Sequence, residues 1–112
     1  MPEVTGGATV VAPGAGAAVL TIAAASIPAG TYRVQVSAYV SNNAVADVGN
    51  MKLQRGGVDL VNPLPHGVNG QAIQNQYDEV AFDGSQNLTV NAIGAGTAAI
   101  EYFASVELYR TA

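Results

Sequence analysis

The 112-residue chain contains no cysteine and only one histidine. Without cysteine there are no disulfides, thiolate metal sites or thiol nucleophiles, so the core and any subunit contacts must supply the stability. No apolar run approaches the ~20 residues of a membrane span, and the start Met1-Pro2-Glu3 lacks the basic residues of a secretory signal. We therefore expect a soluble protein with no membrane partner that is not exported by that route.

Charge is also scarce, because Asp, Glu, Lys and Arg make up 11% of the chain against a typical value of about 25%. The four basic residues are scattered and outnumbered by eight acids, so the positive footprint that nucleic acid binding requires is missing. A neutral surface rich in Ala, Gly, Val and Asn is a solubility liability for a free monomer. We expect part of this surface to be covered by another subunit or another protein.

Two long segments show the two-residue alternation of a strand with one apolar face. They span residues 31–41 and 98–109. The apolar positions are Tyr32, Val34, Val36, Ala38 and Val40 in the first segment, and Ala98, Ile100, Tyr102, Ala104, Val106 and Leu108 in the second. Two such strands indicate a β-sandwich.

Shorter strands are predicted at 17–23, 48–55, 58–61, 73–82 and 88–92. Gly56 and Gly57 supply a tight reversal, which predicts a hairpin over 52–61. Tyr77 falls out of phase with Val80 and Phe82, which predicts a bulge near Asp78. About eight strands separated by regular turn signals predict an all-β fold, a single antiparallel β-sandwich that is jelly-roll-like.

Residues 1–16 are expected to form a flexible or arm-like N-terminal segment, and residues 17–112 the sandwich domain. Only Glu3 ionises in this first part, and Gly and Ala offer little side-chain area for packing. The piece 8–12 fits a strand equally well. Both interpretations, arm and strand, remain open at this point.

No residues of catalytic type assemble into a recognisable centre. The single histidine, His66, would need an activated partner as a general base, or two or three companions as a metal ligand. Asp78, Glu79 and Asp83 are the closest approach to a calcium site, but Asp78 and Glu79 should point to opposite faces of a strand. We expect no enzyme activity, no cofactor and no metal.

Two surfaces are candidates for contacts with other molecules. The segment 62–70 is rich in Pro and Gly and predicts an exposed loop, whose contact residues would be Asn62, Leu64, His66 and Asn69. The outward aromatics Tyr39, Phe103 and Tyr109 fit a subunit interface, where aromatic side chains are enriched. The same three rings would also fit a platform on which carbohydrate stacks.

With these features the chain resembles the small jelly-roll decoration (cement) proteins of tailed-bacteriophage capsids. The resemblance rests on size, on the Ala/Gly/Val/Asn-rich composition without cysteine, and on the sandwich pattern over 17–110. It includes AGTYRVQV at 29–36 and YFASVELY at 102–109. The same two segments are similar to strands of trimeric head domains of the C1q and tumour-necrosis-factor type, which phages use in fibres.

The first resemblance implies a structural virion protein, made in the host cytoplasm, that binds the major capsid protein on the outer capsid surface. It would bridge capsomers as a homodimer or homotrimer. The residues expected to dock to the shell are Val4, Thr5, Thr9, Val10 and Val11. The second implies a receptor- or glycan-binding head of a fibre, with its site in the 62–70 loop, and a polymer-binding module of a secreted enzyme is a third interpretation.

Overall fold

The computed structural model describes residues 2–11, 16–41, 50–68, 71–93 and 101–112. Within these ranges the strands are β1 (Val4–Val11), β2 (Ala18–Ile22), β3 (Gly30–Ser41), β4 (Met51–Arg55), β5 (Val58–Leu64), β6 (Gly67–Val68), β7 (Ile73–Phe82), β8 (Leu88–Ala92) and β9 (Glu101–Arg110). One 3₁₀ turn spans Ala24–Ser26. In the described part of the chain, no helix is long and apolar enough to cross a membrane.

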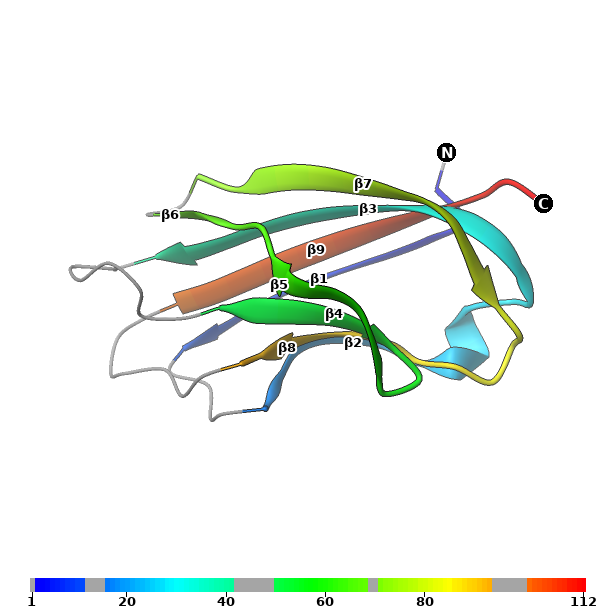
Figure 1. Ribbon diagram of the computed structural model, residues 1–112, viewed down its shortest axis with the longest axis horizontal. Helices are drawn as coiled ribbons and strands as arrows, with labels where there is room; N and C mark the ends of the chain where they lie inside the picture. The colour runs from blue at the N-terminus through cyan, green and yellow to red at the C-terminus, as the bar shows by residue number, and fades with distance from the viewer. Residues whose placement is uncertain (1, 12–15, 42–49, 69–70, 94–100) are drawn as a thin grey trace.

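The strands form two sheets that pack face to face, which confirms the all-β sandwich (Figure 1). The first sheet has the order β1-β9-β3, and both β7 and the short β6 lie on the far side of β3. The second sheet has the order β2-β8-β4-β5. The chain changes sheet at every step except from β4 to β5 and from β6 to β7. The resulting orders, β1-β9-β3-β7 and β2-β8-β4-β5, are the double Greek-key arrangement of a jelly roll.

The core is filled by the inward residues of the alternating strands. Tyr32 on β3 and Tyr102 on β9 are fully buried. The Tyr32 hydroxyl donates a hydrogen bond to the Pro28 carbonyl oxygen at 2.7 Å, and its ring meets Phe82 edge-on with centroids 5.6 Å apart. Burial raises the pKa of Tyr77 and Tyr102 above the ordinary value of 10.0, so both hydroxyls stay neutral at physiological pH.

The predicted bulge in β7 is confirmed. The pairing of β3 with β7 shifts between Tyr32 opposite Val80 and Val34 opposite Tyr77. Asp78 and Glu79 therefore both lie opposite the single residue Arg33. Glu79 takes a positive φ of 55°. The shift returns Val80 and Phe82 to the core side.

The predicted β4–β5 hairpin is also confirmed, with Gly56 and Gly57 at φ 58° and 82°. The loop expected at 62–70 is wrong in two places, because β5 continues to Leu64 and Gly67–Val68 forms strand β6 beside β3. Pro63 is tolerated since β5 is an edge strand, where a missing N–H costs no ladder bond. Leu64 is opposite Met51 and only 1% exposed, so it anchors β5 and is not a contact residue.

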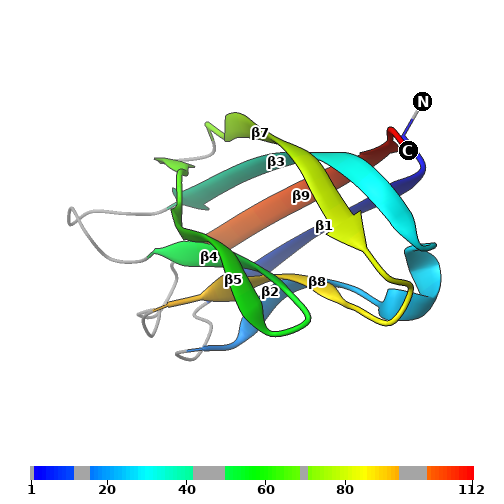
Figure 2. The same ribbon diagram turned by 45° about the vertical axis from the view of Figure 1, so that its right-hand side comes forward.

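The N-terminal segment is corrected as well, because Val4–Val11 forms strand β1 of the sandwich and not a separate arm. All eight residues pair antiparallel with β9, and Figure 2 shows β1 running beside β9. Gly6 permits this fit, because a Cβ atom there would lie 3.3 Å from Ile22 Cγ1 in the second sheet. The sandwich therefore includes β1.

Candidate interaction face

The outer face of the first sheet extends over four strands of eight to twelve residues. We define it by residues that alternate with the buried positions of β1, β9, β3 and β7. Cross-strand register arranges them in rows, with Arg33 and Tyr109 at one end and Val11 and Glu101 at the other. The three rows between them are Thr5, Glu107, Gln35 and Gln76; Gly7, Ser105, Ser37 and Gln74; and Thr9, Phe103 and Tyr39. The middle row carries no charge and consists mainly of small side chains.

A pair of stacked aromatic rings lies toward one end of this outer face, and an arginine over a tyrosine ring lies at the other. The rings of Tyr39 and Phe103 stack with centroids 4.9 Å apart and planes at 19°. At the other end the guanidinium carbon of Arg33 lies 4.5 Å from the centre of the Tyr109 ring. The prediction that these three aromatics point outward is confirmed, whereas their role in subunit contact stays a prediction.

Side-chain amides connect β3 and β7 across the outer face. Gln74 Nε2 donates to Gln35 Oε1 at 3.3 Å, and Gln35 Nε2 donates to Gln76 Oε1 at 3.2 Å. Gln76 Nε2 then donates to Asp78 Oδ1 at 3.0 Å. These bonds order long neutral side chains before any partner arrives, which lowers the entropy cost of binding. The sequence analysis did not predict this chain of amide hydrogen bonds, although glutamines two residues apart in 73–82 could have indicated it.

The residues predicted to dock to a shell divide between two faces of β1. Thr5, Thr9 and Val11 point outward and are exposed, and Val11 is 56% exposed. Val4 and Val10 point inward and pack, partly buried, against the core. On the outer face, the predicted docking set is therefore represented by Thr5, Thr9 and Val11, and its role in docking stays a prediction.

The outward part of that set is continuous with the predicted subunit surface. Thr9 is opposite Phe103, and Phe103 is opposite Tyr39. The sequence suggested two separate surfaces, and the register of the sheet makes them one.

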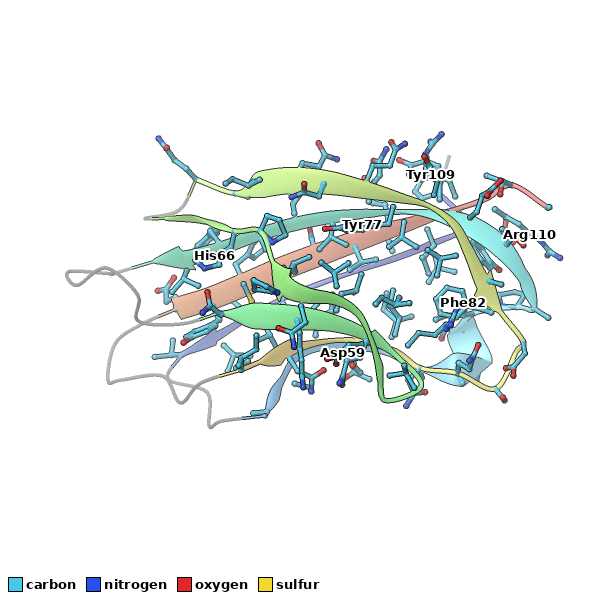
Figure 3. All side chains as sticks on the ribbon, in the orientation of Figure 1. Asp59, His66, Tyr77, Phe82, Tyr109 and Arg110 are labelled. Atoms are coloured by element: carbon cyan, nitrogen blue, oxygen red, sulfur yellow. The ribbon has the colours of Figure 1, made fainter. Side chains whose placement is uncertain are left out.

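An open depression of about 490 Å³ lies where this face meets the β7 bulge. Its lining residues are Arg33, Gln76, Asp78, Glu79 and Thr111. The guanidinium can donate hydrogen bonds and the two carboxylates can accept them, and this combination suits a hydroxylated ligand. Tyr109, labelled in Figure 3, lies on β9, and its ring packs against the Arg33 guanidinium of this lining.

The acids considered as a calcium site are not brought together. Asp83 lies in the turn after β7, where its Oδ1 accepts hydrogen bonds from the Ser85 hydroxyl at 2.7 Å and the Ser85 amide at 2.8 Å. The Ser85 hydroxyl is the main cause that lowers the pKa of Asp83. Among the described residues, no group of three or more His, Cys, Asp or Glu side chains is placed to hold a metal ion.

The four residues of the predicted contact loop do not form one surface in the described part of the chain. His66 is half-buried, and its Nδ1 donates to the Gly67 carbonyl oxygen at 2.9 Å. Asn62 is exposed and donates to Asp59 Oδ2 at 3.1 Å, while Leu64 belongs to the core. Asn69 lies outside the described residues. Asn62 and His66 therefore serve local hydrogen bonds, and the loop is a poorer candidate than the outer face.

The outer surface of the second sheet has a different character. Asp59 accepts a hydrogen bond from Gln54 Nε2 at 2.7 Å and lies 3.7 Å from Lys52 Nζ. The hydrogen bond from Gln54 is the largest cause that lowers the pKa of Asp59. Exposed ion pairs of this kind add little stability, and the polar groups of Lys52, Gln54 and Asp59 pair with one another.

Comparison with known proteins supplies no function for this chain. No protein-family model matches it, and no curated protein sequence matches it.

Proposed function

We propose that this protein is a structural virion protein that binds the outside of a phage capsid and stabilises it by bridging capsomers. Its binding surface would be the outer face of the first sheet. The observation that carries the proposal is the continuity of this face, which joins Thr9, Phe103 and Tyr39 in one row. The resemblance to decoration proteins supplies the particular partner, the major capsid protein.

The composition of the face supports a protein partner. Specific interfaces combine aromatic anchors with a core depleted of charge. Here the stacked pair Tyr39 and Phe103 lies beside the uncharged row of Gly7, Ser105 and Ser37, and Tyr109 lies beyond the row that carries Glu107. Small side chains in the middle row let another surface approach closely. Each copy would add a modest interface, and many copies on a symmetric shell would act together.

The proposal is tested by mixing the purified protein with mature shells that lack it and measuring co-sedimentation. We expect saturable pelleting and a higher temperature of shell disruption. Ser105→Lys places a charge at the centre of the outer face and should weaken binding about tenfold or more. Thr89→Lys is the matched control, because Thr89 is an outward residue of β8 in the second sheet with similar half-burial. An absence of saturable pelleting, or an equal loss in both variants, would contradict the proposal.

A receptor- or glycan-binding head of a phage fibre is the second candidate, and the depression at the β7 bulge favours it. Arg33, Asp78 and Glu79 offer donors and acceptors to sugar hydroxyls. Screening saccharides by thermal unfolding tests this function. It predicts that a saccharide raises the melting temperature of the wild type and not of Asp78→Ala.

A further inference from the structure

The edge strands of the two sheets differ in how well they are blocked against pairing with a strand of another molecule. An edge strand leaves half of its backbone N–H and C=O groups without a partner, so it is a template for pairing with another chain. Proteins block such edges with bulges, prolines, charges or short strands. Among the residues that the structure describes, the edges of the first sheet are β1 on one side and β7 with the two-residue β6 on the other, and those of the second sheet are β2 and β5.

Three of these edges carry blocking features. β7 has the bulge at Asp78 and Glu79, with two carboxylates at one place. β2 is five residues long and shifts register between Ala18 and Leu20. β5 shifts register twice against β4 and contains Pro63.

The remaining edge, β1, has none of them. Its sequence VTGGATVV contains no charge and no proline over eight residues. Its pairing with β9 runs from Val4 to Val11 without a register shift. The strand is therefore long, regular, uncharged and already held in the extended conformation by β9.

We propose that the free edge of β1 pairs antiparallel with β1 of a second copy of this chain, forming a two-fold symmetric dimer. An antiparallel pair keeps both faces continuous only when residues of the same face lie opposite each other. With Gly7 on the two-fold axis, Thr5 lies opposite Thr9 of the other copy, and Val4 lies opposite Val10. Each contact occurs twice, since Thr5 of one copy faces Thr9 of the other and the reverse, and only Gly7 faces its own symmetry equivalent, as a two-fold interface requires.

The strand itself argues for a second copy as the occupant. In this register both faces match β-branched side chains, Val4 with Val10 and Thr5 with Thr9, and such cross-strand pairs stabilise sheets. The centre holds only Gly6, Gly7 and Ala8, which allow close approach. No like charges lie opposite each other, because β1 carries none.

The dimer would also have a consequence for the outer face. A two-fold axis perpendicular to the sheet leaves both outer faces on the same side, so one broad surface spans both copies. A pair of eight-residue strands is small beside the ~1,600 Å² of a standard interface. We therefore expect a dimer that dissociates on dilution. This inference does not rest on capsid binding and concerns the purified protein alone.

Sedimentation of the full-length protein over a range of concentrations tests the proposal. The wild type should show reversible monomer–dimer association. The double variant T5K/T9K places like charges opposite each other at two symmetric positions and should raise the dimer dissociation constant about tenfold. The matched variant T5K/T9E places opposite charges there and should keep the dimer or strengthen it. Thermal unfolding of both variants checks that each is folded.

Single cysteines then test the register, because the chain has none of its own. Gly7→Cys should form an intermolecular disulfide readily, since residue 7 lies opposite itself at a Cα separation of about 4.5–5.5 Å. A Cβ atom at Gly7 makes only an ordinary contact of 3.5 Å with Ser105 Cβ, so the variant should fold. Thr5→Cys is the control on the same face, and it should cross-link slowly because its opposite residue is Thr9.

A wild type that stays monomeric at every concentration would overturn the proposal. An equal effect of T5K/T9K and T5K/T9E on the dimer, or equal cross-linking of the two cysteine variants, would overturn it too. Shell binding by a strictly monomeric protein would support the proposed function while contradicting this dimer. A dimer that never pellets with shells would do the reverse, so the two failures are distinguishable.

Discussion

The two edge strands of the first sheet, β7 and β1, differ in how many side chains they bury and in whether their free side is blocked. β7 places Val80 and Phe82 in the core and closes its free side with a bulge. β1 has no fully buried side chain, since Val4 and Val10 are only partly buried. Both strands pair with their neighbour along a ladder, but only β7 adds buried side chains to it and blocks its free side, whereas β1 adds less packing and leaves its free side open.

The largest expected effect comes from removing the anchor of β7. Phe82 is 4% exposed and packs edge-on against Tyr32, so Phe82→Ala should lower the free energy of unfolding by about 3–5 kcal/mol. Val10→Ala on β1 removes a partly buried side chain and should cost only ~1 kcal/mol. Urea denaturation of both variants measures the difference.

Equal losses for Phe82→Ala and Val10→Ala would mean that both edges are anchored by packing in the same way. The contrast between the two edges would then be wrong.

A smaller effect is expected at the bulge itself. Glu79 has φ 55°, a left-handed conformation that costs a residue with a Cβ atom about 1–2 kcal/mol and glycine little. Glu79→Gly should therefore raise the free energy of unfolding by ~1 kcal/mol. Glu79→Ala, which removes the carboxylate and keeps the Cβ atom, is the control and should bring no such gain. If the alanine variant is as stable as the glycine variant, the carboxylate and not the backbone conformation sets the cost.

The two adjacent glycines of β1 sharpen the comparison further, because they point to opposite faces. Gly7→Ala should gain ~0.5 kcal/mol by restricting the unfolded chain, since its new methyl group meets only an ordinary contact with Ser105. Gly6→Ala would place a methyl group 3.3 Å from Ile22 Cγ1, so it should be less stable than Gly7→Ala. If β1 did not pack closely on the second sheet, thermal unfolding would show Gly6→Ala to be at least as stable as Gly7→Ala.

The smallest effect belongs to the charged edge of the second sheet. The pKa of Asp59 on β5 is lowered from 3.8, first by the hydrogen bond from Gln54. A lowered folded-state pKa contributes stability above the unfolded-state pKa, and this contribution is lost as the pH falls through the folded-state value. The wild type should therefore melt slightly higher than Asp59→Asn at neutral pH, and the difference should vanish in strong acid. A difference that persists in acid would trace the effect to something other than this ionisation.

Much of the fold could be predicted because its signals are local. The alternation in 31–41 places Tyr32 in the core without any knowledge of its neighbours, and Gly56-Gly57 predicts the hairpin that the structure has. The bulge was predictable because Tyr77 is out of phase with Val80. In each case, side-chain order along one strand carries the information.

The errors arose where a residue's environment depends on another strand. Pro63 suggests a loop, but an edge strand tolerates it, and Leu64 is consequently buried. The glycines of β1 suggest an arm, yet Gly6 is the residue that lets the strand approach Ile22. The joining of Thr9, Phe103 and Tyr39 depends on cross-strand register, and strand order in a sheet has no local signal in the sequence.

Amide hydrogen exchange at low and high protein concentration tests the open edge most directly, because both edges are observed in one unmodified protein. If β1 pairs with β1 of a second copy, exchange of β1 amides should slow as the protein concentration rises, while exchange of β7 amides should not change. Exchange of β1 that is independent of concentration, or that changes equally with β7, would contradict it.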